Sequence, residues 1–200
     1  MVEKGQPFSS DFAYKRTIFF DVMPECFKER TMEDLKQLKE EEIVKLVQEG
    51  TIGSAQLTDA GICPTCFDKQ NSHVLYGDNQ DKMIFENETF ECLLVGNPRA
   101  EGHTVISTKK HFKDMLEVDD ETCVESFLLA KKVMFALKEV YGAESVYLCT
   151  MCDGPMNHFH LQLIPRYAFE KRGSKNFVKP RMEYKEDLEK IKRLREKLKN

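Results

Sequence analysis

Residues 157–167 read Asn157-His158-Phe159-His160-Leu161-Gln162-Leu163-Ile164-Pro165-Arg166-Tyr167, and two of the five histidines of the chain stand in this otherwise apolar run. The alternation of a β-strand places His158, His160 and Gln162 on one face and the apolar side chains on the other. A row of two imidazoles and an amide is costly to bury for packing alone. This strand is therefore our candidate active site.

Length and charge restrict the class of protein. Two hundred residues allow one domain of ordinary size with terminal additions. The net charge of −4 offers no general electrostatic reason to bind nucleic acid. The first residues lack a basic stretch followed by an apolar core, and no apolar run is long enough for a membrane span. We therefore expect a cytoplasmic protein with no export signal and no membrane partner.

Hydrophobic periodicity predicts the order of the elements. A helix, broken near Glu40, is expected over 31–50 as an addition to the main domain. Short β-like segments follow near 73–77, 82–86, 89–96 and 102–108. A helix is predicted from Asp119 to Tyr141, ended by Gly142, and strands at 145–151 and 158–166 come after it. A last amphipathic helix is expected over 184–199.

The pair Cys63-Pro64-Thr65-Cys66 predicts a metal site. A tetrahedral structural zinc needs four nitrogen or sulfur ligands, and CxxC supplies two on one tight turn. A redox pair is the alternative, but it is expected at the start of a helix after a buried strand, whereas this pair is predicted to lie in a loop. His111 and His158 could complete the tetrahedron and leave His160 free for chemistry. The metal would then be structural.

The run His158-Phe159-His160-Leu161-Gln162 resembles the histidine triad (HIT) motif, in which histidines alternate with apolar residues. The turn Pro98-x-x-x-Gly102-His103 and the segment Lys109-Lys110-His111 are similar to the segments that precede the long helix in that family. The similarity covers residues 80–168. It implies an α+β fold, a HIT-like antiparallel sheet with a long helix packed across it, plus N- and C-terminal helical additions. We accordingly expect a helical extension at 1–60, a catalytic domain with its zinc site at 61–168, and a linker with an amphipathic helix at 169–200.

Gln162 stands where HIT hydrolases have a third histidine. His-x-His-x-Gln is similar to the branch that contains galactose-1-phosphate uridylyltransferases and diadenosine tetraphosphate phosphorylases. Uridylyltransferases of that branch can hold zinc with residues that match Cys63, Cys66, His111 and His158. Some bacterial HIT hydrolases with a CxxC pair have the same kind of site, so the metal does not separate the branches.

The resemblance implies a nucleotide hydrolase or nucleotidyltransferase that acts on the α-phosphate of a dinucleoside polyphosphate or a nucleotide sugar. His160 matches the nucleophile that forms a covalent nucleotidyl intermediate. Gln162 can donate to the phosphoryl oxygens but cannot release a proton, so we expect acidic phosphate leaving groups rather than amines. Gly154, Asn157 and His103 are the remaining substrate-binding candidates, and HIT proteins are commonly homodimers. The alternative is a zinc-stabilised nucleotide-binding or adaptor protein without turnover.

Overall fold

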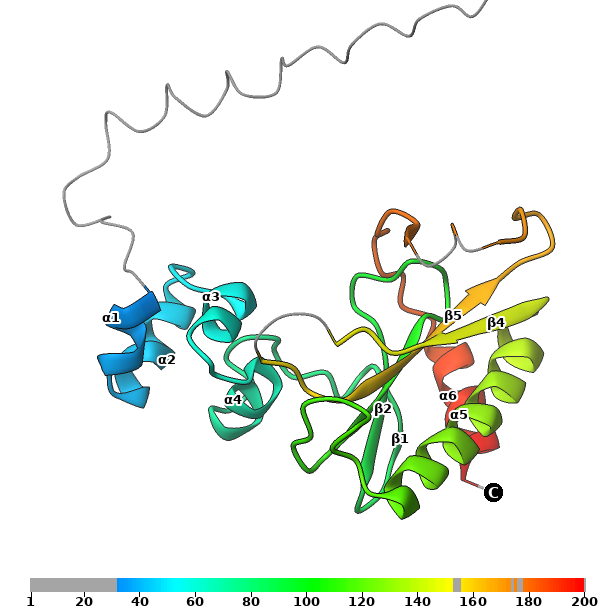
Figure 1. Ribbon diagram of the computed structural model, residues 1–200. Coiled ribbons are helices and arrows are strands. Elements are labelled where there is room, and N and C mark those ends of the chain that lie inside the picture. The colour runs from blue at the N-terminus through cyan, green and yellow to red at the C-terminus, as the bar shows by residue number, and fades with distance from the viewer. Residues whose placement is uncertain (1–31, 153–155, 174, 176–177, 200) are drawn as a thin grey trace, which may run out of the picture.

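The computed structural model describes residues 32–152, 156–173, 175 and 178–199. At its centre is a five-stranded sheet in the order β1-β2-β3-β5-β4, in which every neighbouring pair is antiparallel (Figure 1). The strands are β1 (Met83–Glu86), β2 (Phe90–Leu94), β3 (Thr104–Thr108), β4 (Ser145–Cys149) and β5 (His160–Arg166). The predicted α+β fold is confirmed.

One face of the sheet is covered by helix α5 (Asp120–Tyr141), as the periodicity predicted. The side chain of Asp119 accepts from the backbone N–H of Thr122 at 2.9 Å and caps the first turn. Gly142 ends the helix in the left-handed region, at φ 71°. Leu129, Val133 and Leu137 on its inner face join the core of the sheet.

Helix α6 (Leu188–Leu198) docks on the same core through Ile191, Leu194 and Leu198. It starts four residues later than the predicted 184–199, because the side chain of Asp187 accepts from the backbone N–H of Lys190 and caps the helix there. The C-terminal helix therefore packs on its own chain.

Four short helices lie beside the sheet (Figure 1): α1 (Met32–Gln37), α2 (Glu40–Gln48), α3 (Ser54–Asp59) and α4 (Pro64–Gln70). They surround a second apolar cluster that shares no residue with the sheet core and includes Leu35, Ile43, Leu57 and Phe67. None of the described helices is long and apolar enough to span a lipid bilayer. The predicted domain limits, 1–60, 61–168 and 169–200, stay predictions.

The β-like segment predicted near 73–77 is wrong, because residues 71–76 form turns. The buried carboxylate of Asp68 accepts the backbone N–H groups of Leu75 and Tyr76 at 2.8 and 2.9 Å. These two donors are thus satisfied without a neighbouring strand, so the segment needs no place in the sheet.

Candidate metal centre and active site

Cys63, Cys66, His111 and His158 come together at one point, and their ligand atoms all lie within 4.8 Å of one another. The Sγ of Cys66 is 3.4 Å from Nδ1 of His111 and 3.5 Å from Nδ1 of His158, which is 3.6 Å from the Sγ of Cys63. In a zinc tetrahedron with Zn–S of about 2.3 Å and Zn–N of about 2.05 Å, sulfur and nitrogen are about 3.6 Å apart. The donor set and its spacing fit zinc.

The imidazole of His158 is oriented for coordination by a second contact. Its Nε2 donates to the backbone oxygen of Thr108 at 2.7 Å, which leaves Nδ1 unprotonated and facing the sulfurs. Burial lowers the pKa of His158 and favours the neutral ring that binds a metal. The sequence pattern could not identify the carbonyl of Thr108 as the group that orients His158.

The loop placement of the CxxC pair was wrong. Cys63 is the N-cap of α4, Pro64 occupies the first helical position, and Cys66 lies in the first turn. The pair therefore does start a helix, but the element before it is α3 and not the buried strand that a redox pair is expected to follow. Burial and the neighbouring Cys63 raise the pKa of Cys66 to about 11, and a bound cation would reverse this shift.

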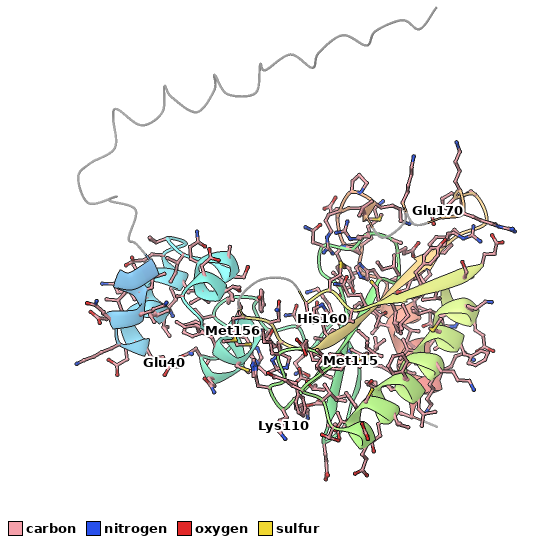
Figure 2. All side chains as sticks on the ribbon, in the orientation of Figure 1. Glu40, Lys110, Met115, Met156, His160 and Glu170 are labelled. Carbon is pink, nitrogen blue, oxygen red and sulfur yellow. The ribbon has the colours of Figure 1, made fainter. Side chains whose placement is uncertain are left out.

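His160 follows at the start of β5, with Gln162 next along the same face. Nδ1 of His160 donates to the backbone oxygen of His158 at 2.9 Å. Nε2 then carries the lone pair and accepts from the amide nitrogen of Gln162 at 3.2 Å. The half-buried ring is thus held as the neutral tautomer with one nucleophilic nitrogen toward the amide. Figure 2 shows His160 at the end of the sheet that faces the short helices.

His103 lies beside this row but is only 1% exposed. Its Nδ1 accepts from the backbone N–H of Arg99 at 3.1 Å, so Nε2 carries the proton. Burial lowers the pKa of His103 to about 4, assisted by the positive charges of Arg181 and Arg99. The ring is therefore neutral near pH 7, and its buried Nε2 has no hydrogen-bond partner within the described chain.

The remaining predicted contacts flank the row. Asn157 is half-buried immediately before His158. Gly154 lies outside the described residues. Reasoning from the sequence missed Arg99 and Arg181, which approach His103 from two segments. Arg99 could have been identified from the sequence, because it lies inside the Pro98–His103 turn that the motif singled out. Arg181 lies in a polar stretch with no distinguishing pattern.

A family model described as HIT domain matches residues 76–169, which include the histidine motif. An uncharacterised HIT-like protein of Methanocaldococcus jannaschii is 29% identical over 98 residues, which cover 47% of this chain and 75% of the relative. A hypothetical histidine triad nucleotide-binding protein from Sulfolobus tokodaii is similar in structure, with 26% identity, a TM-score of 0.49 and coverage of 59% of this chain and 83% of the other. A zinc-bound histidine triad family protein from Mycobacterium smegmatis is 23% identical, with a TM-score of 0.48 and coverage of 58% and 83%.

Proposed function

We propose that this chain, which belongs to the histidine triad (HIT) superfamily through its residues 76–169, is a nucleotide hydrolase or nucleotidyltransferase. Its substrate is a dinucleoside polyphosphate or a nucleotide sugar, attacked at the α-phosphate. The observation that carries the proposal is the hydrogen-bond row from the backbone oxygen of His158 through both ring nitrogens of His160 to the amide of Gln162. Such a row orients a neutral imidazole as a nucleophile.

The first step forms a bond between Nε2 of His160 and the α-phosphorus and breaks the bond from that phosphorus to the bridging oxygen. The leaving phosphate departs with the electron pair. The amide nitrogen of Gln162, which donates to Nε2 at 3.2 Å, then transfers its hydrogen bond to a phosphoryl oxygen as charge develops. In the second step an acceptor oxygen attacks the phosphorus, the bond from phosphorus to Nε2 breaks, and its electron pair returns to Nε2. The proton of the acceptor passes to solvent water, and the imidazole is free again.

Gln162 restricts the leaving group. An amide cannot protonate a departing atom near pH 7, whereas a histidine can. A phosphate or sugar phosphate leaves as a stable anion and needs no proton, but an amine does. We therefore infer that polyphosphates and sugar phosphates are preferred over nucleoside phosphoramidates, and that Asn157 and the neighbouring Gly154 contribute further donors to the phosphoryl group.

We also propose that Cys63, Cys66, His111 and His158 hold a structural zinc, supported by their 3.4–3.6 Å sulfur–nitrogen distances. Zinc with four protein ligands has no open position, so its contribution is to fix the strand that carries His160. Elemental analysis of protein purified without chelators tests this site. We expect one zinc per chain and its loss in Cys66→Ser, while metal-free wild-type protein would refute the assignment.

A substrate panel tests the enzymatic function. Purified protein would be incubated with dinucleoside polyphosphates, nucleotide sugars and a nucleoside phosphoramidate, each with and without added phosphate. We expect turnover of the first two classes and none by His160→Gly. Acceleration by phosphate, with a nucleoside diphosphate as product, would identify phosphate as the acceptor. Saturable nucleotide binding with no turnover would contradict the enzyme and favour a zinc-stabilised nucleotide-binding adaptor.

A further inference from the structure

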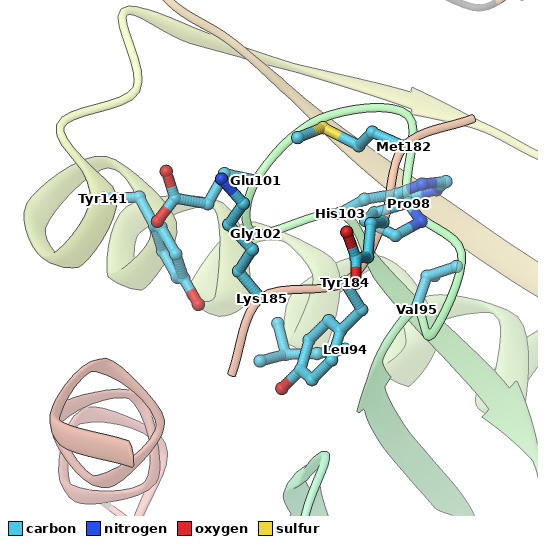
Figure 3. Close-up of a pocket in the computed structure, with 11 residues that line it drawn as sticks. Leu94, Val95, Pro98, Glu101, Gly102, His103, Tyr141, Met182, Tyr184 and Lys185 are labelled. Carbon is cyan, nitrogen blue, oxygen red and sulfur yellow. The ribbon is translucent and has the colours of Figure 1, made fainter. Parts of the chain in front are cut away.

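The C-terminal segment between β5 and α6 lies against the turn that joins β2 to β3. The backbone N–H of Met182 donates to the oxygen of Pro98 at 2.8 Å, and Nη1 of Arg181 donates to the oxygen of Asn97 at 2.8 Å. In the opposite direction, Nη1 of Arg99 donates to the oxygen of Lys179. Figure 3 shows residues 182–185 crossing the turn that carries Pro98, Gly102 and His103. These reciprocal contacts bring Arg99 and Arg181 together from segments about eighty residues apart.

Neither guanidinium group is paired with a carboxylate among the residues that the structure describes, whereas the adjacent Lys179 pairs with Glu170 at 2.6 Å. Burial lowers the pKa of Arg181, and the charge of Arg99 lowers it further. The Nε of Arg99 is buried without a hydrogen-bond partner in the described chain. Two like charges at one place repel each other, and a bound anion would relieve the repulsion and accept from the unused Nε of Arg99.

The position of the pair relative to the active face follows from the sheet register. Gln162 pairs with Val105 of β3, and His103 lies two residues before Val105, on the same face of the sheet. The ring of His103 accepts from the backbone N–H of Arg99 at 3.1 Å, and Arg181 donates to the same turn. The turn that holds the two arginines therefore lies beside the Gln162 end of the row.

The opposite end of the row is closed to a phosphate chain. There His158 is enclosed by Cys63, Cys66 and His111, and the nearby Lys69 is already paired with Glu91 at 2.7 Å. The cavity of about 170 Å³ under the C-terminal segment is a separate space, because Glu101, Glu183 and Lys185 line it and neither arginine does. A chain of phosphates that starts at His160 meets free positive charge beyond Gln162.

We propose that Arg99 and Arg181 form a binding site for the phosphates of the leaving group. The proposal rests on the proposed function for the position of the α-phosphate, and it deepens that function by favouring substrates with several phosphates beyond the bond that breaks. Because Arg181 lies outside the matched family domain of residues 76–169, the C-terminal segment is assigned a part in substrate selection as well as in packing.

Inorganic tripolyphosphate tests this site by calorimetric titration of the full, zinc-loaded chain, with zinc content checked afterwards. We expect wild-type protein to bind it and Arg181→Gln to bind about tenfold more weakly, the scale of one lost charge-assisted contact. Arg181→Lys, which keeps the charge but not the planar fork, should fall between them. The matched control is Arg172→Gln, which removes an 87%-exposed arginine of the same segment and should stay within about twofold of wild type.

Absence of binding to wild-type protein, equal binding by Arg181→Gln, or an equal loss in Arg172→Gln would each overturn the site. A melting temperature near wild type for Arg181→Gln separates lost binding from lost folding, and Arg181 is exposed enough for this variant to fold. The titration requires no turnover, so a failure of the catalytic proposal would not mimic a failure of the arginine site. With active protein, Arg181→Gln should raise KM for a dinucleoside tetraphosphate. Its KM for a substrate whose leaving group carries no phosphate should equal that of wild type.

Discussion

Removing one zinc ligand should release the helical segment from the sheet. The apolar cluster of α1–α4 shares no residue with the sheet core, and the proposed metal joins Cys63 and Cys66 of the first body to His111 and His158 of the second. The ion pair between Lys69 and Glu91 also links them, but partly exposed pairs contribute about 1 kcal/mol at most. Zinc at a thousandfold excess over its dissociation constant contributes about 4 kcal/mol.

Cys63→Ser should therefore weaken the docking of residues 32–70 by about 4 kcal/mol. A cluster of this size is too small to stay folded alone, so its amide protons should exchange about a thousandfold faster. Protection within β2, β3 and α5 should be nearly unchanged. Hydrogen exchange with mass spectrometry measures both regions in one experiment, and Cys152→Ser serves as a control that removes a thiol outside the cluster.

Wild-type protection of residues 32–70 in the Cys63→Ser variant, with no metal bound, would refute this reasoning. Uniform loss of protection across the sheet would refute it as well, because the metal would then support the whole fold rather than the junction.

Three further results are expected. Gly102→Ala should lower the free energy of unfolding by about 2–4 kcal/mol in urea titrations, because φ is +73° and a Cβ would lie 3.1 Å from Cδ2 of Tyr141. Gly142→Ala is the control: its φ is +71° but no atom lies within 4 Å of the added Cβ, so it should show only the loss due to backbone strain. Equal losses in the two variants would contradict the contact with Tyr141. The pKa of His103 is about 4 in the folded chain and near 6.5 in the unfolded chain, so between these pH values the unfolded chain binds the extra proton. The free energy of unfolding should therefore fall by about 3 kcal/mol as pH decreases from 6.5 to 4. An equally steep fall in His103→Gln would exclude this residue as the cause. A homodimer should use the exposed apolar side chains of α5, where Leu128 is 61% and Phe135 62% exposed. In sedimentation, wild-type protein should then be a dimer and Leu128→Glu a monomer. A monomeric wild type would contradict the prediction.

The fold followed from local signals where those signals were strong. Asp119 and Gly142 mark both ends of α5 as predicted. Alternation placed His160 and Gln162 on one face of β5, although the strand begins at His160 and not at the predicted His158. The strand prediction at 73–77 failed because these residues form turns whose backbone N–H groups donate to Asp68. The sequence does not show that this carboxylate is buried. The start of α4 at Pro64 was missed because a helix of seven residues gives too little periodicity.

The site was predictable to the extent that its chemistry is local in sequence. The four zinc-ligand candidates were identified by residue type and are brought within 4.8 Å of one another. The carbonyl of Thr108 and the guanidinium of Arg181 were not predictable, since both act through tertiary contacts that no local pattern encodes.

Trapping the covalent intermediate on His160 is the most direct test of the proposed function. Zinc-loaded protein would be mixed with a radiolabelled dinucleoside polyphosphate, quenched in alkali, in which a phosphorus–nitrogen bond persists, and mapped by peptide mass spectrometry. We predict one nucleotidyl group on the peptide that contains His160, located on that ring, and none in His160→Gly. Turnover without this adduct, an adduct on another residue, or nucleotide binding with neither turnover nor adduct would contradict His160 as the nucleophile.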